Sequence, residues 1–384
     1  MADKIKVMHI IPNLRGGGAE RVCFDLLMNL DADKYEKSLI LFKDNGEGQI
    51  WREQLANRGV KIIALKKQYL FDLKNFREIF SAIKKNKPHI LHTHLGGDIY
   101  GRLAGFLNKV PIIISTEHNL NKQERKGATC LKTLTSLWAD MIFPVSEAVK
   151  QDAQKRYRLN PHKLTVIYNG IDTNIFKSKS VESLNKDEPR LNDVNLNKDK
   201  AEKIIIGSLG RLTEQKGFKI LIEAISKTKH KNFLVKIGGE GELKEVLQKQ
   251  IDNLGLSERI FLLGQVDPID FLKEIDIFVL PSLWEGLGLV VLEAALANKP
   301  IIASRVDGLL EIINSDNAWL FTAGDSNELA RQIDELIDNL NSEETQRKIA
   351  SIRKIVEEKF SLTKMVENYS AWYEKLSQKK IKAK

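Results

Sequence analysis

Short apolar runs alternate with amphipathic stretches along almost the whole chain. The first run is residues 5–11, IKVMHII, and the stretch that follows it, residues 19–30, places Val22, Leu26 and Leu30 on one helical face. This alternation predicts parallel strands that are connected by helices covering both faces of a sheet. The strands expected in the first half are residues 5–11, 38–42, 60–65, 89–94, 110–116, 141–145 and 164–168.

The same pattern returns after a polar interruption. Residues 177–203 are charged and have neither a helical nor a strand period, so we interpret them as a linker or surface insertion. A chain of 384 residues is long enough for two domains. The predicted fold class is α/β, with two Rossmann-like parallel-sheet domains, residues 1–176 and 204–359, facing across a cleft. The strands expected in the second half are residues 204–209, 233–238, 260–263, 277–280, 300–304 and 318–321.

The most informative segment is residues 278–300, FVLPSLWEGLGLVVLEAALANKP. It reads as the end of a strand, a glycine-containing loop that carries Glu285, and a helix that carries Glu293. Free backbone amides at a helix N-terminus favour an anion. A diphosphate held there would have one carboxylate near each of its two substituents. Because a nucleotide sugar is a diphosphate between a ribose and a hexose, this spacing fits such a ligand.

A second loop adds positive charge beside these carboxylates. Residues 210–217 follow the first strand of the second half and carry Arg211 and Lys216. An arginine and a lysine together can neutralise a diphosphate and replace a metal ion as the group that holds it. Two basic loop residues are more often simply solvated. The interpretation therefore depends on their combination with Glu285 and Glu293.

Three glycine loops could bring backbone amides to a ligand. Gly16, Gly17 and Gly18 follow the first strand and open a helix, so they could approach an anion or form a flexible turn. Their order is not G-x-G-x-x-G, which argues against a dinucleotide-dependent redox enzyme. Residues 239–241 and 264–266 follow later strands and could contact a nucleobase.

Several histidines lie on or beside the expected strands of the first half. His92 and His94 share one strand face, but no cysteine or carboxylate stands at ligand spacing beside them to complete a zinc site. Satisfied core histidines are therefore the simpler expectation. His118 differs because residues 116–119 lie where a strand reaches the cleft, and we expect it to contact a sugar or an acceptor.

The net charge of +9 favours an anionic partner. No basic motif with interleaved aromatic residues is present, so we expect no nucleic-acid binding. No leader-like segment opens the chain, and no apolar run reaches the ~18 residues of a spanning helix. These features predict a cytoplasmic protein.

Residues 66–87 have two possible interpretations, one of which is contact with a membrane surface. Residues 66–87 are basic and amphipathic, and Tyr69, Leu70 and Phe71 come before the helical part. This composition suits peripheral contact with an anionic membrane, but a basic helix packed on the sheet would look the same. Further positive charge comes from Lys122, Arg125 and Lys126 and from four lysines after residue 378.

The ordered set of motifs resembles the retaining glycosyltransferases of family four, which have the GT-B fold. The resemblance covers nearly the whole chain, and Glu285-x₇-Glu293 is its most specific element. The other matching motifs are Gly16-Gly17-Gly18, His92-Thr93-His94, Thr116-Glu117-His118, Val145-Ser146-Glu147, Asn169-Gly170-Ile171-Asp172, Gly210-Arg211 and Lys216-Gly217.

The resemblance implies a role for each matching residue. Glu285 and His118 would be the catalytic residues, both contacting the transferred sugar, and Glu293 would bind the ribose. Arg211 and Lys216 would hold the diphosphate. Further donor-binding residues would be Gly286, Leu287, Gly288, Leu289 and Val266, and the acceptor or diphosphate loop would be Gly16, Gly17 and Gly18.

The resemblance also implies a reaction and its partners. The donor would be a nucleotide-diphosphate sugar, with UDP favoured, and the acceptor a cell-surface glycan or a polyprenyl-linked sugar. Transfer would retain the anomeric configuration without a metal or cofactor. A last helix, from about Phe360, would cross back to the first domain. A nucleotide-sugar epimerase and a non-catalytic nucleotide-sugar-binding subunit are the alternatives on the same fold.

One departure from the family concerns the loop after residues 300–304. Many relatives have paired glycines there, whereas this chain has Asp307-Gly308-Leu309-Leu310-Glu311. The added carboxylate leaves the path of this loop open.

Overall fold

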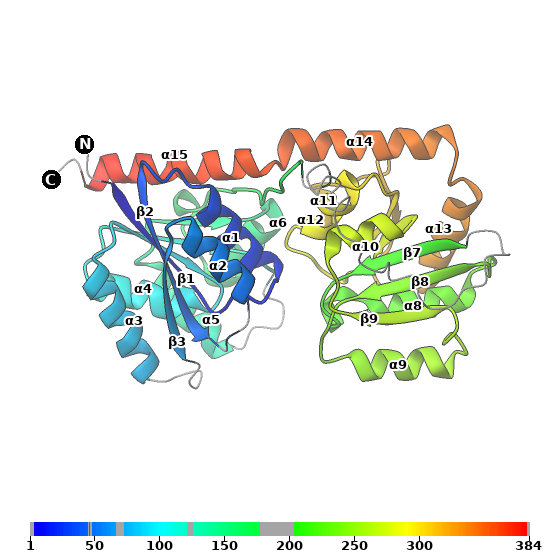
Figure 1. Ribbon diagram of the computed structural model, residues 1–384, viewed down its shortest axis with the longest axis horizontal. Helices are drawn as coiled ribbons and strands as arrows, with labels where there is room; N and C mark the ends of the chain where they lie inside the picture. Colours follow the sequence, from blue (N-terminus) through cyan, green and yellow to red (C-terminus); the bar gives the residue numbers. More distant parts are fainter. Residues whose placement is uncertain are drawn as a thin grey trace. The chain divides into compact units, whose positions relative to one another are not determined.

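The computed structural model describes residues 4–44, 46, 48–66, 73–120, 126–174, 176 and 203–381. The chain divides into two compact units, which Figure 1 shows: unit 1 is Met1–Gly170 with Leu362–Lys384, and unit 2 is Ile171–Ser361. The division after Gly170 lies six residues before the boundary expected from the sequence pattern. Nearly all of the expected linker, residues 177–202, lies outside the described residues.

Unit 1 contains a six-stranded parallel sheet in the order β3-β2-β1-β4-β5-β6. Its strands are β1 (Ile5–Ile11), β2 (Tyr35–Asp44), β3 (Lys61–Lys66), β4 (Ile90–His94), β5 (Ile112–Glu117) and β6 (Met141–Pro144). Its α-helices are α1 (Gly18–Asn29), α2 (Gln49–Asn57), α3 (Leu73–Asn86), α4 (Gly97–Leu107), α5 (Lys126–Ser136), α6 (Glu147–Tyr157) and α15 (Leu362–Lys380).

The seventh strand predicted for this half, residues 164–168, is wrong. Only Leu164 forms a bridge, to Ile142 of β6. Ile167 donates a hydrogen bond to the carbonyl of Pro144, at 3.0 Å. Pro144 itself has no N–H to return, so a parallel ladder cannot continue along β6.

Unit 2 repeats this architecture, with sheet order β12-β11-β10-β7-β8-β9. Its strands are β7 (Ile204–Leu209), β8 (Phe233–Gly238), β9 (Ile260–Gly264), β10 (Ile277–Leu280), β11 (Ile301–Ser304) and β12 (Trp319–Phe321). Its α-helices are α8 (Phe218–Lys227), α9 (Lys244–Asn253), α10 (Pro268–Glu274), α11 (Leu289–Leu296), α12 (Asp307–Leu310), α13 (Ser326–Asp338) and α14 (Glu343–Lys359). The prediction of two Rossmann-like parallel-sheet domains is confirmed.

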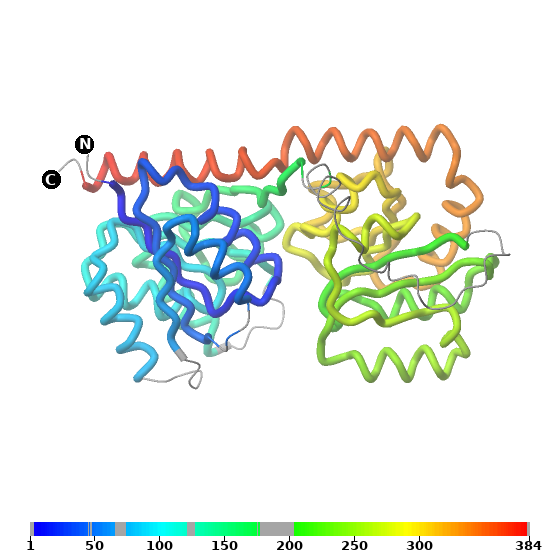
Figure 2. The backbone as a smooth tube through the Cα atoms, viewed as in Figure 1, coloured from blue at the N-terminus to red at the C-terminus, as the bar shows by residue number. Residues whose placement is uncertain are grey.

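The last helix of the chain belongs to unit 1. Figure 2 traces it in red along the blue N-terminal elements, and α15 contacts both α1 and β5. Its inward face buries Met365, Tyr369, Tyr373 and Leu376. These positions follow the four-residue repeat of one helical face, which explains why the tail docks on apolar surface.

Candidate active site

Unit 2 brings Lys216 and Glu285 together at one edge of its sheet. Lys216 follows β7 and Glu285 follows β10, and these two strands are neighbours although far apart in sequence. The strand order reverses between them, and parallel α/β sheets bind ligands at such a switch point. Lys216 Nζ donates to Glu285 Oε1 at 2.5 Å, and Ser282 Oγ donates to the same oxygen at 2.7 Å. Glu285 is only 4% exposed.

Backbone contacts hold these two loops side by side. Leu283 N donates to the carbonyl of Gln215 at 2.8 Å, and Gln215 Nε2 donates to the carbonyl of Trp284 at 3.1 Å. Gly217 has a φ of +64°, and a Cβ there would lie 2.0 Å from the carbonyl oxygen of Pro281. The loops can approach this closely only because the residue is glycine.

Gly308 is a site residue that sequence reasoning missed. A Cβ at Gly308 would lie 2.2 Å from the carbonyl oxygen of Glu285 and 2.6 Å from that of Gly286. The chain departs from the family at Asp307, which is exposed, yet it keeps glycine where the loop after β11 meets the Glu285 loop. The glycine in this departing motif was the available signal, but only the structure identifies what it contacts.

The other predicted donor-binding residues lie on α11 and on the loops that follow β7, β9 and β10. Arg211 is exposed in the loop after β7, and Glu293 is half-buried in the second turn of α11. No described contact joins Arg211 or Glu293 to the Lys216–Glu285 pair. Gly288 caps α11 with a φ of +80°. Of the remaining four, Gly286 and Leu287 are buried, whereas Leu289 and Val266 are half-buried.

In unit 1 the predicted residues lie at the corresponding edge of the first sheet. Gly16 and Gly18 are exposed and Gly17 is half-buried, and together they lead from β1 into α1. His118 follows β5 and is 7% exposed. Burial lowers the pKa of His118 to about 4, so its imidazole is neutral at pH 7. The ring lines a cavity of about 170 Å³.

Four charged side chains, Asp98, Arg102, Glu117 and Lys132, cluster at this cavity, and no sequence motif groups them. Lys132 Nζ donates to Glu117 Oε2 at 2.6 Å, and Arg102 lies 3.5 Å from the other oxygen of Glu117. Burial raises the pKa of Asp98 to about 6, against the opposite effect of Arg102. Burial would also raise the pKa of Glu117, but Lys132 and Arg102 bring it below its ordinary value. Asp98, Glu117 and Lys132 all line the cavity.

Three histidines approach one another as metal ligands could. Ring nitrogens of His9, His92 and His94 lie within 4.8 Å of one another. Each of the six ring nitrogens already has a protein partner within 3.2 Å. A metal ion would have to break these contacts, so the donor set fits a hydrogen-bonded cluster better than a metal centre.

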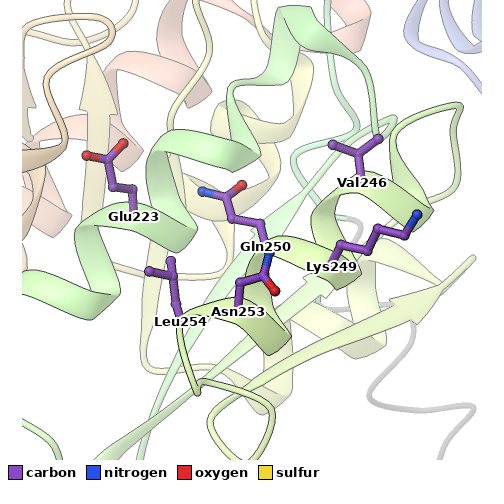
Figure 3. Close-up of a pocket in the computed structure, with 6 residues that line it drawn as sticks. All are labelled: Glu223, Val246, Lys249, Gln250, Asn253 and Leu254. Carbon is purple, nitrogen blue, oxygen red and sulfur yellow. The ribbon is translucent and has the colours of Figure 1, made fainter.

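A second cavity lies away from the predicted site. It measures about 470 Å³ and lies in unit 2, where Figure 3 draws the side chains that line it from α8 and α9. None of the predicted donor-binding residues lines this cavity. The lining residues are Glu223, Val246, Lys249, Gln250, Asn253 and Leu254.

The basic helix α3 packs against the sheet through its apolar face. Ile79 and Ile83 are buried, and Phe76 and Phe80 pack against the same core cluster. Tyr69, Leu70 and Phe71, which precede the helix, lie outside the described residues, as do Lys122, Arg125, Lys382 and Lys384. Among the described helices, none is long and apolar enough to cross a bilayer.

The fold defines the class of protein. Two six-stranded parallel sheets, each in Rossmann order, are the architecture of a GT-B glycosyltransferase. The chain belongs to glycosyltransferase family four. The family model described as Glycosyltransferase Family 4 matches residues 16–175, and the model described as Glycosyl transferases group 1 matches residues 191–354.

Two curated relatives resemble the chain over most of its length. UDP-Gal:alpha-D-GlcNAc-diphosphoundecaprenol alpha-1,3-galactosyltransferase of Escherichia coli is 27% identical, covering 91% of this chain and 93% of its own. N-acetylgalactosamine-N,N'-diacetylbacillosaminyl-diphospho-undecaprenol 4-alpha-N-acetylgalactosaminyltransferase of Campylobacter jejuni is 27% identical, covering 82% and 85%.

The solved structure of Anabaena HepE, in complex with UDP and glucose, has a similar fold. It superposes with a TM-score of 0.81 over 97% of this chain and 100% of its own, at 19% identity.

Proposed function

We propose that this protein transfers a hexose or N-acetylhexosamine, with retention of anomeric configuration, from a UDP-sugar to a lipid-linked glycan acceptor. The observation that carries the proposal is the buried ion pair of Lys216 and Glu285 at the switch point of unit 2. Two findings support the partners. Both relatives named above have names that specify diphosphoundecaprenol-linked sugars, and the HepE structure contains UDP and glucose.

The ion pair has bonding capacity left for a donor. Glu285 Oε1 accepts from Lys216 and Ser282, and no described residue donates to Oε2. We expect Oε2 to accept a hydroxyl of the transferred sugar. An ammonium group has three N–H donors, so Lys216 can keep its bond to Glu285 and also donate to a phosphate oxygen. With Arg211 it would neutralise the departing diphosphate without a metal ion.

The rest of the donor would lie along the start of α11. Free amides at this helix N-terminus suit a phosphate, and they come from the residues that follow Glu285. Glu293, farther along the helix, would accept hydroxyls of the ribose. Val266, after β9, would contact the base. Unit 2 would thus be the donor-binding domain and unit 1, with Gly16–Gly18 and His118, the acceptor-binding domain.

The proposed reaction is a front-side displacement. The acceptor hydroxyl attacks the anomeric carbon on the face from which the diphosphate departs, so configuration is retained. The bond from that carbon to the phosphate oxygen breaks, and the departing oxygen takes the hydroxyl proton. The products are the glycoside and the nucleoside diphosphate, and the proposed step forms no covalent enzyme intermediate.

We also propose a cytoplasmic location with contact to the anionic inner membrane surface, where a polyprenyl-linked acceptor resides. The exposed Arg77, Lys84 and Lys85 of α3 would provide the charge, because the apolar face of the helix is already used by the core. Flotation with anionic vesicles tests this location. Salt-sensitive binding supports it, and absence of binding at low salt contradicts it.

Product analysis tests the activity. The full chain is incubated with UDP-hexoses and UDP-N-acetylhexosamines, with and without a polyprenyl-diphosphate-linked sugar. We expect UDP release only with the acceptor, together with a lipid product heavier by one α-linked sugar. An epimerised nucleotide sugar without acceptor would indicate an epimerase. A raised melting temperature with a nucleotide sugar, but no turnover with any acceptor, would indicate a binding subunit.

A further inference from the structure

A single file of buried hydroxyl and imidazole groups runs through unit 1 and ends at the cavity beside His118. We call it the histidine chain. Its members, in spatial order, are Tyr369, Thr116, His92, Tyr373, His9, His94 and His118.

Every neighbouring pair in the histidine chain is within hydrogen-bonding distance. Thr116 Oγ1 lies 3.0 Å from the Tyr369 hydroxyl and 2.7 Å from His92 Nε2. The Tyr373 hydroxyl lies 2.6 Å from His92 Nδ1 and 3.2 Å from His9 Nε2.

The second part of the chain contains only imidazoles. His9 Nδ1 lies 3.0 Å from His94 Nε2, and His94 Nδ1 lies 3.0 Å from His118 Nε2. Cys23 Sγ is 3.8 Å from His9 Nδ1, within reach of a weak sulfur hydrogen bond, but His94 Nε2 at 3.0 Å is the closer and stronger partner of that nitrogen.

A count of hydrogens restricts how this chain can be arranged. Burial lowers the pKa of all four histidines well below neutral pH, so each ring carries one N–H. Each hydroxyl also carries one hydrogen. Seven groups therefore supply seven hydrogens to six contacts, and one hydrogen is left without a place in the chain.

The surplus hydrogen has few places to go. His9, His92 and His94 use both nitrogens inside the chain, so none of them can hold it outside. If Thr116, Tyr369 or Tyr373 held the surplus hydrogen, a buried hydroxyl would have no acceptor among the described residues. An unsatisfied buried donor lowers the stability of the fold. The remaining place is His118 Nδ1, which is likewise buried and without a partner among the described residues but belongs to a side chain that lines a cavity.

We propose that the histidine chain is proton-ordered in one direction, with all four histidines protonated on Nδ1, so that His118 presents an N–H donor to the cavity. This N–H would donate a hydrogen bond to an oxygen atom of a bound donor sugar or of the acceptor substrate. This part of the inference rests on the proposed function. The direction of the chain follows from burial at one end and a cavity at the other.

This arrangement gives the C-terminal helix a positioning role. Tyr369 and Tyr373 come from α15, whereas His118 follows β5. His94 donates to His118 Nε2, so this nitrogen cannot carry a hydrogen and the Nε2–H tautomer of His118 is excluded. The hydrogen of His118 is therefore on Nδ1. The five groups from Tyr369 to His9 act on His118 through His94.

Nitrogen NMR of the full chain, labelled with ¹⁵N-histidine, tests the proposal directly, because the long-range spectrum distinguishes Nδ1–H from Nε2–H. We expect His9, His92, His94 and His118 in the Nδ1–H form. His89 is an internal control of opposite sign, since its Nδ1 accepts a hydrogen bond from Lys6 N at 3.1 Å and must be unprotonated. The variant H118Q identifies the His118 signals.

A matched pair of variants tests the link to activity. H94L removes the donor to His118 Nε2 and should produce a mixture of His118 tautomers. It should also lower kcat/KM for the proposed donor roughly 3- to 10-fold, the usual effect of one neutral hydrogen bond. Y35F removes a hydroxyl that bonds Ser370 of α15 but lies outside the histidine chain, and it should change neither property.

The NMR measurement stands even if the proposed activity fails. An Nε2–H form of His118 in the unaltered protein, or a mixture of its two forms, would overturn the proposal. So would a stoichiometric bound metal found by elemental analysis, because metal ligation by His9, His92 or His94 breaks the chain. A protein with four Nδ1–H signals and no transferase activity would keep the ordered chain and reject only the role assigned to His118.

Discussion

The two units have the same strand order, but different kinds of polar side chain lie at the switch point of each sheet. In unit 1 the switch point lies between β1 and β4, which carry His9, His92 and His94 on the strands themselves. In unit 2 it lies between β7 and β10, and the polar residues Lys216 and Glu285 stand on the loops that follow. One unit fills this position with buried imidazoles and the other with a single ion pair.

This difference determines what each unit is sensitive to. Unit 1 places four neutral histidines and a buried network of two acidic and two basic side chains in or beside its core, so its stability depends on protonation. The sheet core of unit 2 is apolar, and its loops depend on glycines such as Gly217 and Gly308 that let backbones touch. Acid should therefore destabilise unit 1 first. Methyl groups added at the glycines of unit 2 should displace the loops of its candidate site.

The largest expected effect is acid unfolding of unit 1. The four histidines have folded pKa values below their unfolded value of 6.5, with His9 at about 3 and His118 at about 4. Such bases stabilise the fold above pH 6.5, and this stability is lost as pH falls toward the folded values. Between pH 6.5 and its folded pKa, each histidine lowers the free energy of unfolding by about 1.4 kcal/mol per pH unit. Asp98, with its pKa raised to about 6, acts oppositely and offsets one of the four.

Hydrogen exchange measured between pH 7 and 4.5, with rates corrected for intrinsic pH dependence, checks this expectation. Peptides from β4 and β5 should lose protection before peptides from β8 and β10. The variant H230Q, which removes the surface histidine of unit 2, should leave both profiles unchanged. Simultaneous loss of protection in the two units would contradict the comparison.

The next largest effect should come from Glu285→Ala. Removing the buried carboxylate takes away the proposed contact to the reacting sugar, and turnover should fall roughly 10²- to 10³-fold. Nucleotide affinity, measured by calorimetry with UDP, should change much less. The control Glu223→Ala alters the wall of the large cavity between α8 and α9 and should leave turnover intact. Equal losses in the two variants would place the donor elsewhere.

The apolar runs predicted each of the twelve strands in the part of the chain that the structure describes, because buried parallel strands need a continuous apolar run. β12 is the shortest strand, Trp319–Phe321, and even this was visible as Ala318 to Phe321. The error at residues 164–168 has a specific cause. Its residues look like a strand, but Pro144 in the neighbouring strand cannot complete the ladder, and that depends on which strand becomes the neighbour.

The candidate site was predictable where spacing along the chain carries the chemistry, as in the glycine loop between Glu285 and Glu293. Contacts between distant segments were not predictable. Nothing in the sequence says that Gly308 touches the backbone of Glu285, or that Tyr373 lies between His9 and His92. These contacts depend on strand order and on the docking of α15.

A single methyl group tests the glycine dependence of unit 2. In Gly308→Ala the new Cβ would clash with the carbonyl oxygens of Glu285 and Gly286, so the loop after β10 must move. We expect a loss of about 1–3 kcal/mol in the free energy of unfolding, as for other overpacked sites, together with at least a tenfold loss of turnover. Gly127→Ala on α5 meets nothing within 4 Å and should be neutral or slightly stabilising. Comparable stability of the two variants in urea would argue against the contact.

The smallest effect should separate positioning from stability in unit 2. Ser282→Ala removes the hydroxyl that donates to Glu285 Oε1 but leaves Lys216 in place on the same oxygen. Because the carboxylate keeps its charged partner, losing this second donor should cost about 1.5 kcal/mol, the low end for a hydrogen bond to a charged group, and turnover should fall roughly 10-fold. Ser208→Ala is the matched control, since Ser208 bonds only the carbonyl of Val279 within the same sheet. If Ser282 orients Glu285, the two variants should have the same melting temperature and differ in turnover. If Ser282 only supports the loop, the two variants should differ in melting temperature but have the same turnover per folded molecule.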